Sequence, residues 1–342
     1  MRVMALVKRI LRQLVRDKRT IGLLIFAPIL VLTMLYFVFN GNDYIPKIGF
    51  IDVPEIIADQ IDTDGAEVTN FKNESEAMER LNSQELDGYL KFEDNNPSIV
   101  LEGSDPSITG ATMKWFQNAL PKPPQAVELP ELQIDYLHGS SDMGQFDYFG
   151  PVLLGFFVFF FVFLIAGVSF LRERTTGTLE RLLASPLRKW EIVAGYVIGF
   201  GLFTMIQSTI ITAYAIFVLD MVMEGAFIYV LLIILILALT ALTLGILLSS
   251  FAHNELQMMQ FIPIVVVPQV FFSGLFNLET IAEWLSWISY LTPLYYAAEA
   301  LRDVMVRGAG WEAIYPNVLV LLAFCLLFIA INILVLRKYR KI

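Results

Sequence analysis

The sequence predicts a mainly α-helical, polytopic membrane protein with six transmembrane helices. It also predicts a small extracellular α/β domain between helices 1 and 2 and a re-entrant element before helix 6. Hydrophobic residues make up 56% of the 342 residues and charged residues only 17%, whereas soluble domains carry about 25% charge. In addition, long segments carry no charge, and the remaining charge is distributed unevenly. The apolar excess therefore predicts contact with lipid.

Six uncharged segments are long enough to cross a bilayer. A hydrocarbon core about 30 Å thick requires roughly 20 apolar residues in a helix, the structure that satisfies its own backbone in lipid. The six predicted spans are Ile21–Phe39, Tyr148–Leu171, Ile192–Leu219, Ala226–Phe251, Leu256–Leu278 and Ala313–Leu336. The fifth is the least regular, because it contains Pro263 and Pro268. Trp284–Ala298 is uncharged for only 15 residues, which predicts a re-entrant or interfacial element within residues 279–312.

The charges that flank the spans predict their orientation. Lys and Arg gather in cytoplasmic connections, and here they gather in residues 1–20, in residues 172–191 and after Leu336. Residues 41–147 carry 21 acidic and 6 basic side chains, a net charge of −15, so the rest of the chain carries +6. We therefore expect a multi-pass protein of the plasma membrane, of bacterial origin, with both termini cytoplasmic and residues 41–147 outside.

Residues 1–20 predict a cytoplasmic amphipathic helix. At 100° per residue, the apolar residues between Val3 and Val15 share one face, opposite the basic residues Lys8, Arg9, Arg12, Arg16 and Arg19. Such a helix lies at the membrane surface against anionic lipid. It either anchors the topology or docks a cytoplasmic partner. Residues 21–40 predict an uncleaved transmembrane helix 1, because no small-residue cleavage site follows the apolar run.

Residues 41–147 predict a small α/β domain. The patterns indicate strands at Lys47–Asp52, Asp87–Phe92 and Ser98–Leu101 and helices at Ser75–Asn82 and Ser107–Leu120. The proline-rich run Pro121–Pro124 predicts a stiff connection back to the membrane. The acidic surface is more consistent with a solvated exterior face than with a cation site, since no spacing resembles a calcium loop.

The cytoplasmic loop 172–191 reads RERTTGTLERLLASPLRKWE. Gly177 ends the preceding helix, Thr178 is a candidate N-cap, and Pro186 ends a short helix that begins there. This helix would present Leu179, together with Leu182 and Leu183, beside its charges. Exposed leucines next to charged side chains are suited to binding a partner protein.

The continuous sequence RERTTGTLERLLASPLRKWEIVAGYVIG resembles the signature of type-2 ABC transporter permeases, in which Arg-Glu-Arg, Gly-Thr-Leu-Glu and Ser-Pro-Leu lead into the third span. The resemblance implies a dimer, of two copies or of two paralogues, energised by cytoplasmic ATP-binding subunits and working as an exporter. It also implies an ATPase-coupling loop that contains Arg172, Glu173, Arg174, Gly177, Thr178, Leu179, Glu180 and Arg181. The outer domain is larger than in the polysaccharide-exporting branch and closer to the drug, antibiotic-resistance or sodium-extruding branches.

The sequence lacks the motifs for binding ATP, for metal or disulfide sites and for proton coupling. No G-x-x-x-x-G-K-[ST] loop occurs, so we expect ATP and Mg²⁺ on the partner subunit, and no cofactor, catalytic residue or enzymatic activity in this chain. The single Cys325 and the distant His138 and His253 argue against disulfide and metal sites. The six predicted spans contain no Asp, Glu, Lys, Arg or His, whereas proton-coupled machines need such intramembrane charges. The energy for transport would therefore come from another chain, and we expect lipid but no nucleic acid as a further partner.

Polar residues within the predicted spans are candidates for lining a pathway. The main candidates are Gln207, Thr212, Thr243, Gln260 and Asn332, accompanied by Ser208, Thr209, Thr240 and Gln269. Hydrogen bonds between helices are the alternative role and the one favoured for most of them. Gly195 and Gly199 form a GxxxG pattern that permits close helix packing, either within one chain or between chains.

These observations predict an export permease that moves a hydrophobic drug, antibiotic or lipid-like molecule outward. The same architecture exporting sodium or a polysaccharide is the first alternative. A non-transporting membrane sensor is the second, and it fits less well because sensors usually carry a cytoplasmic signalling domain and this chain has only short cytoplasmic pieces.

Overall fold

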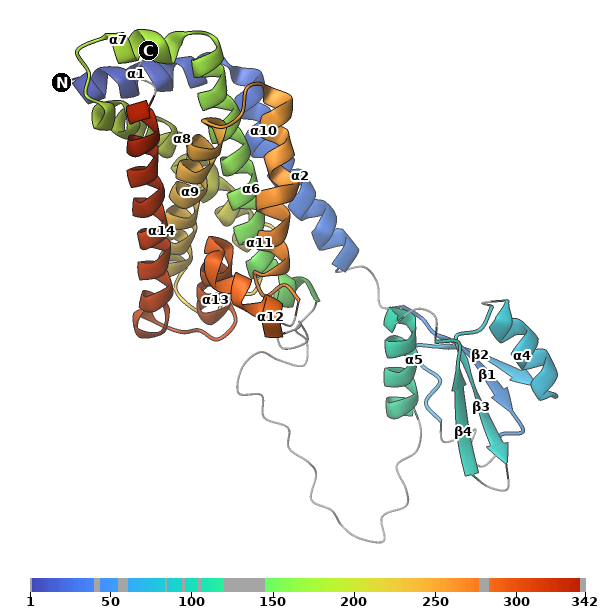
Figure 1. Cartoon of the computed structure of the whole chain (residues 1–342). Coiled ribbons are helices and arrows are strands. Elements are labelled where there is room, and N and C mark those ends of the chain that lie inside the picture. The colour runs from blue at the N-terminus through green and yellow to red at the C-terminus, as the bar shows by residue number, and fades with distance from the viewer. Residues whose placement is uncertain are drawn as a thin grey trace. The chain divides into compact units, whose positions relative to one another are not determined.

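The computed structural model describes residues 2–39, 44–54, 61–83, 85–93, 96–103, 106–119, 145–276 and 283–338. The chain divides into two compact units, which are shown in Figure 1. The helical bundle comprises Met1–Asn40 and Tyr136–Ile342, and the α/β unit comprises Gly41–Asp135. The predicted connection Pro121–Pro124 lies outside the described residues.

The bundle contains long apolar helices and several short ones. The long helices are α2 (Lys18–Phe39), α6 (Gln145–Thr175), α8 (Lys189–Phe217), α9 (Phe227–Ser249) and α14 (Trp311–Lys338). The short helices are α1 (Arg2–Arg16), α7 (Thr178–Ala184), α10 (Glu255–Phe261), α11 (Val267–Phe271), α12 (Glu283–Ser286) and α13 (Pro293–Met305). A π-helical segment, Ile262–Val266, joins α10 to α11, and a 3₁₀ segment, Trp287–Leu291, joins α12 to α13.

Five helices of the described chain are long and apolar enough to cross a membrane. They correspond to the predicted spans 1, 2, 3, 4 and 6. Helix α9 is central, with 78% of its apolar stretch buried, whereas α2 and α14 bury only 17% and 22% and are peripheral. Lipid or a further protein chain would have to cover the exposed apolar faces of α2 and α14.

The predicted fifth span is not a single regular helix. Its helical part is the 17-residue stretch Glu255–Phe271, which is about 25 Å long at 1.5 Å per residue and is interrupted by the π-helical segment. Pro263 begins the irregularity, because proline has no N–H to donate to the preceding turn. Residues 277 and 278 of the predicted span lie outside the described chain, so the count of six spans stays a prediction.

The segment predicted to be re-entrant forms short helices at one end of the bundle. Residues 279–282 are not described, and α12 and the 3₁₀ segment are followed by α13. One face of α13 is buried against α6, α9 and α14, through side chains that include Leu294, Leu301 and Val304. At 13 residues, α13 is too short to cross a bilayer.

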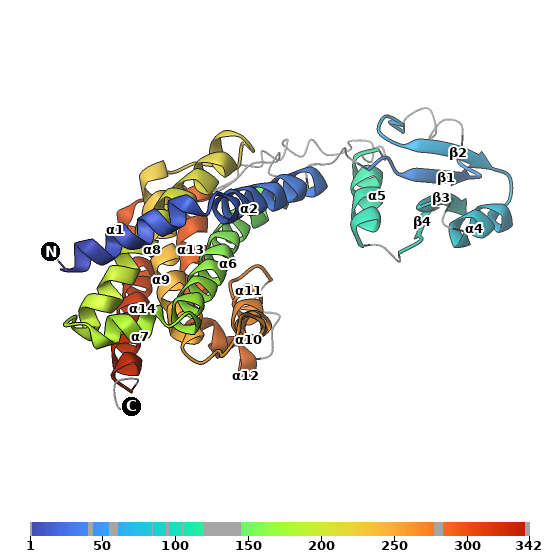
Figure 2. The same ribbon diagram turned by 90° about the horizontal axis from the view of Figure 1, so that it is seen from above.

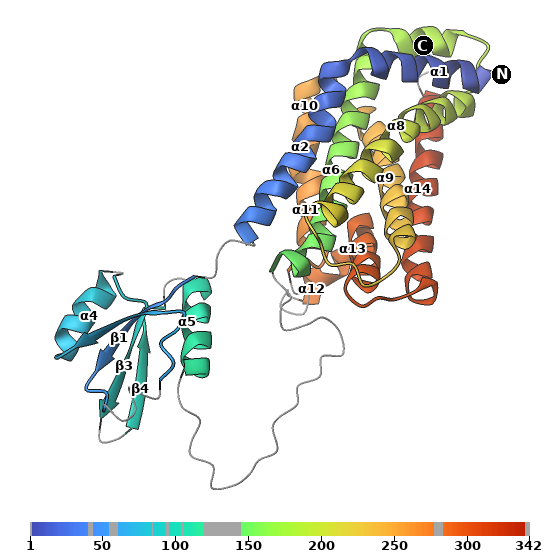
Figure 3. The ribbon, with the colours of Figure 1, turned by 180° about the vertical axis from the view of Figure 1, so that it is seen from behind.

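Helices α1 and α7 lie at the end of the bundle opposite α12 and α13, as Figures 1 and 3 both show. The view along the bundle in Figure 2 shows α1 crossing over α8. The turn at Asp17 separates α1 from α2 and redirects the chain from the bundle end into the first long helix. The candidate site is built at this end.

Within its described residues, the α/β unit is a four-stranded sheet with one helix on each face. Its strands are β1 (Lys47–Ile51), β2 (Glu67–Phe71), β3 (Gly88–Glu93) and β4 (Asn96–Leu101), and its helices are α4 (Glu74–Asn82) and α5 (Pro106–Ala119). The strand order is β2-β1-β3-β4, with β1 parallel to β2 and β3, and with β3 antiparallel to β4. Side chains alternate along β1, so Ile48 and Phe50 pack with Trp115 of α5, and Ile51 packs with Leu81 of α4.

The predicted elements of this unit have counterparts in the structure, but the prediction missed β2. Its sequence, EVTNF, has few apolar residues because β2 is an edge strand with mostly exposed side chains. Period-two apolar patterning is therefore weak there.

Candidate functional site

Two glycines of α8 allow helix α1 to pack closely against it. Leu6 and Ile10 of α1 are buried and lie directly over Gly195 and Gly199 of α8. A Cβ atom added at Gly195 would lie 2.4 Å from Leu6 Cδ2, and one at Gly199 would lie 3.0 Å from Ile10 Cβ. The GxxxG pattern therefore accommodates a helix of the same chain.

A buried carboxylate joins α1 to the end of α6. Glu173 is only 4% exposed, and its Oε2 atom accepts a hydrogen bond from Arg9 Nη2 at 2.7 Å and another from the Tyr196 hydroxyl at 3.1 Å. Arg9 comes from α1 and Tyr196 from α8, so one carboxylate links three helices. A buried charge without such partners is costly, which means that Glu173 favours the docked position of α1.

The two arginines beside Glu173 fix the C-terminal end of α6 to neighbouring helices. Arg174 donates from Nη1 to the carbonyl oxygens of Ser249 at 3.2 Å and Ser250 at 2.7 Å, and from Nη2 to that of Ala252. These carbonyls lie at and just after the C-terminal end of α9, where backbone carbonyl groups lack intrahelical donors. Arg172 donates from Nε and Nη2 to Glu255 Oε1 of α10, at 3.2 and 3.1 Å.

The turn after α6 starts α7 in a way that the sequence only partly predicted. Gly177 has φ = 70°, a left-handed conformation that glycine adopts without steric cost. Gly177 is the N-cap of α7, so the assignment of Thr178 as the N-cap is wrong. Thr178 is instead the first helical residue, and its hydroxyl accepts a hydrogen bond from Arg181 Nη2 at 3.2 Å.

Helix α7 turns its leucines inward and its charges outward. Leu179 is 2% exposed and belongs to the core of the bundle, and Leu182 and Leu183 are half-buried against that core. The expectation of exposed leucines is therefore wrong for Leu179, because the apolar side chain gains more free energy from the core than from solvent. Glu180 and Arg181 are exposed, so the surface that α7 offers to a partner is charged.

The chain between α7 and α8 is tied down as well. Arg2 Nη1 of α1 donates to the carbonyl oxygen of Pro186 at 3.0 Å. The Glu191 carboxylate accepts from the backbone N–H of Arg188 at 2.6 Å and so stabilises the start of α8. The whole loop is therefore supported from α1, α6 and α8 rather than extending freely from the bundle.

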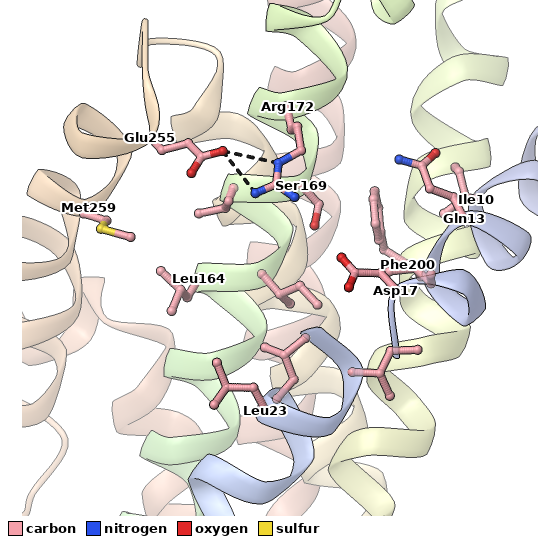
Figure 4. Close-up of a pocket in the computed structure, with 15 residues that line it drawn as sticks. Ile10, Gln13, Asp17, Leu23, Leu164, Ser169, Arg172, Phe200, Glu255 and Met259 are labelled. Atoms are coloured by element: carbon pink, nitrogen blue, oxygen red, sulfur yellow. Dashed lines mark hydrogen bonds and ion pairs between the residues drawn. The ribbon is translucent and has the colours of Figure 1, made fainter. Parts of the chain in front are cut away.

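A cavity of about 320 Å³ lies beneath this loop, between the α1–α2 turn, α6, α8 and α10. It is lined by Ile10, Gln13, Leu14, Asp17, Ile21, Leu23, Leu24, Leu164, Ile165, Val168, Ser169, Arg172, Phe200, Glu255 and Met259. Figure 4 shows the Arg172–Glu255 pair at one end and apolar side chains such as Leu164 and Leu23 below it. The lining is mostly apolar, and its polar groups are the Arg172–Glu255 pair together with Gln13, Asp17 and Ser169.

The polar residues predicted in the spans are distributed differently. Asn332 Nδ2 donates to the carbonyl oxygen of Thr243 at 2.9 Å, and Gln207 Nε2 donates to that of Leu24 at 3.0 Å. Thr243 also bonds within its own helix. Hydrogen bonds of this kind join or cap helices in lipid.

The remaining pathway candidates do not line the cavity beneath the loop. Thr212 is buried and Gln260 is exposed on α10. The cavity contains none of the five main candidates, so a role in lining a pathway stays a prediction for each of them.

Several residues of the site were not singled out from the sequence. The sequence places Arg9 only on the basic face of an amphipathic helix, and it carries no motif that marks Tyr196 or Glu255. The available signal was a charged side chain at the apolar boundary of α1, where Arg9 adjoins Ile10. That signal cannot identify a partner 164 positions away in the chain.

Comparison with known proteins agrees with this architecture. Residues 18–334 match the sequence profile described as ABC-2 family transporter protein. ABC transporter G family member 20 of Dictyostelium discoideum is 25% identical over 305 residues, which cover 88% of this chain and 39% of that protein. The probable multidrug ABC transporter permease YbhR of Escherichia coli is 24% identical over 171 residues, covering 48% of this chain and 46% of YbhR.

The inner membrane transport permease YhhJ of Escherichia coli is 25% identical over 177 residues, which cover 51% of this chain and 47% of YhhJ. In these three relatives the match spans less than half of the relative's own length. The profile, in contrast, covers nearly the whole of this chain, including four of the long helices, most of α14 and the loop with Gly177. The chain therefore belongs to the ABC-2 family of transporter proteins.

Proposed function

We propose that this chain is the membrane-spanning permease of an ATP-driven ABC exporter, and that a separate ATP-binding subunit docks on the end formed by α1 and α7. Glu180 and Arg181 carry the proposal, because they are exposed on a short helix whose other face is fixed in the bundle. A force applied to α7 would reach α6 through the Gly177 turn and α1 through Glu173. A rigidly supported charged surface is suited to receiving such a force.

The topology follows from the same proposal. The α1 and α7 end faces the cytoplasm, and the α/β unit lies outside the cell, consistent with the excess of Lys and Arg at the first and of acidic residues in the second. The exposed apolar faces of the peripheral helices leave room for a second permease, identical or paralogous. A single cysteine introduced by Thr176→Cys in a Cys325→Ser background tests the orientation. An impermeant maleimide should label it only after the membrane is opened, and labelling of intact cells would contradict the topology.

The cargo that fits best is a hydrophobic drug, antibiotic or lipid-like molecule. The cavity combines a mostly apolar lining with the polar Arg172–Glu255 pair, and one of the relatives, YbhR, is described as a probable multidrug permease. An amphipathic molecule would match both parts of the cavity. A hydrated sodium ion would instead meet a mostly apolar lining.

Charge reversal on α7 tests the docking. The variant Glu180→Arg should lose co-purification with the ATP-binding subunit co-expressed with it, because it reverses a charge that α7 presents to that subunit in the proposed interface. Glu76→Arg makes the same change at an exposed site of the α/β unit and should leave pairing unchanged. Undiminished pairing and ATP hydrolysis in Glu180→Arg would contradict docking through α7.

Filling the cavity tests the cargo. Leu164→Trp places a larger side chain in the cavity and should abolish stimulation of ATP hydrolysis by hydrophobic drugs while leaving basal hydrolysis in place. Ile228→Trp adds a similar bulk at an exposed position of α9 and serves as the control. Full drug stimulation in Leu164→Trp would show that the cavity is not part of the transport route.

A further inference from the structure

Two hollows on the surface of α1 share the same three cations. The first, of about 600 Å³, is lined by the apolar residues Met4, Val7, Leu11 and Val15 of α1 and Leu202 of α8, together with Lys8, Arg12 and Arg16. The second, of about 610 Å³, is lined by Ala5, Arg9 and Gln13 together with the same Lys8, Arg12 and Arg16. The three cations therefore lie on the boundary between an apolar hollow and a polar one.

These cations differ from the other arginines of α1. Arg9 pairs with Glu173 and Arg2 with the Pro186 carbonyl. Lys8, Arg12 and Arg16 are exposed and have no hydrogen bond or ion pair within the part of the chain that the structure describes. They follow one another at four-residue intervals, so they lie about 6 Å apart along one face. Like charges at this spacing repel each other, and an anion placed between them would relieve the repulsion.

The apolar hollow continues onto α8. Met4 and Val15 are apolar but 66% and 65% exposed, so they form an apolar surface next to the row of cations. Leu202 is followed on α8 by Ile206 and Ile210, exposed by 62% and 40% at the same four-residue spacing. Because α8 is long and apolar enough to cross the membrane, this stripe leads from the hollow into the bilayer.

We propose that this pair of hollows is a binding site for one anionic phospholipid. Its phosphate group contacts Lys8, Arg12 and Arg16 on the side of the polar hollow, and an acyl chain passes over Met4, Val15 and Leu202 and then along α8. An acidic protein segment would satisfy the cations and leave the apolar hollow uncovered, whereas a phospholipid satisfies both. The site requires a membrane-embedded chain and does not depend on the identity of the cargo or on an ATP-binding subunit.

Native mass spectrometry of the purified full chain tests the proposal. The protein is equilibrated in detergent with equal amounts of phosphatidylglycerol and phosphatidylcholine, and the retained lipids are counted. The test variant combines Lys8→Gln, Arg12→Gln and Arg16→Gln. The control variant combines Lys47→Gln, Lys72→Gln and Lys114→Gln, which removes the same charge from exposed sites of the α/β unit.

The unmodified and control proteins should retain one phosphatidylglycerol molecule in preference to phosphatidylcholine, and the test variant should lose that preference. A cation near an anionic lipid surface contributes about a fivefold preference, so even partial loss is measurable. An undiminished preference in the test variant, or an equal loss in the control, would overturn the proposal.

The apolar half of the site has its own test. Leu202→Ser should weaken retention of phosphatidylglycerol without changing the preference for the anionic headgroup. Free glycerol phosphate should fail to displace the lipid at equal concentration, because it lacks the acyl chain. Complete displacement by glycerol phosphate or by a polyglutamate peptide would instead show an anion or protein site and overturn the lipid assignment.

Discussion

The contact between Leu6 and Gly195 offers the sharpest test of how α1 is docked. In Gly195→Ala the added Cβ would lie 2.4 Å from Leu6 Cδ2, 2.9 Å from Cγ and 3.1 Å from Cβ. Carbon atoms in contact normally lie about 3.5–4.0 Å apart. Because the Cβ of Leu6 is also too close, a change of rotamer cannot relieve the clash and α1 itself must move.

The magnitude follows from two opposing effects. Overpacking of this kind costs about 1–3 kcal/mol, whereas replacing a helical glycine by alanine stabilises a helix by about 1 kcal/mol. A Cβ atom added at Gly22 of α2 would have no atom within 4 Å, so Gly22→Ala provides the second effect without the first. The two variants should therefore differ by about 1–3 kcal/mol in the free energy that holds α1, which is roughly 5- to 150-fold in its opening equilibrium.

Hydrogen–deuterium exchange of the α1 amides in lipid nanodiscs measures this opening. We expect faster exchange of α1 in Gly195→Ala than in Gly22→Ala. The double variant Gly195→Ala with Leu6→Ala should be less destabilised than the sum of its single changes, because the truncated side chain makes room for the new methyl group. Equal exchange in the two glycine variants, or strict additivity in the double variant, would refute the packing argument.

Three further predictions concern the charged contacts. Glu173→Gln should weaken the docking of α1 by about 1–3 kcal/mol. This loss is smaller than that expected on breaking a fully buried ion pair, because Arg9 is 38% exposed. A double-mutant cycle of Glu173→Gln with Arg9→Gln measures the coupling energy. Arg174→Gln should lower the thermal unfolding midpoint by several degrees, since it removes donors worth about 1–3 kcal/mol from the end of α9, whereas Arg181→Gln should have little effect. Lys91 lowers the pKa of Glu74 below its ordinary 4.5, so this pair stabilises the α/β unit above that pH and the stabilisation is lost as the pH falls through the lowered pKa. Lys91→Gln should therefore flatten the acid-dependent exchange of the sheet amides; an unchanged pH profile would contradict the assignment.

The charged loop illustrates how far the sequence could lead. The run from Arg172 to Glu191 predicted a short helix between two long ones, and the structure contains α7 at that place. The inward direction of Glu173 and Leu179 was not predictable, because it depends on α1 and on the bundle core. Local patterning defines the elements of such a loop, but the side of each element that becomes buried depends on its neighbours in space.

The α/β unit shows the same division. Runs of apolar residues predicted β1, β3 and β4, whereas β2 has mostly exposed side chains and was missed. The order β2-β1-β3-β4 places β1 between two parallel neighbours, an arrangement that the strand sequences alone do not specify. Pairing between strands is a long-range interaction, and short amphipathic segments are compatible with several orders.

By itself, the sequence determined the membrane character of the protein, because uncharged runs of about 20 residues leave the backbone few other stable environments than a lipid-embedded helix. It also determined the position of the loop that carries Gly177. Only the tertiary structure decided that the Gly195 and Gly199 surface receives α1, that Glu173 joins three helices, and that Lys8 lies with two further cations at the edge of an apolar hollow. These features depend on contacts between residues far apart in the chain, and the free energy of such contacts is set by packing distance and burial, which no local pattern encodes.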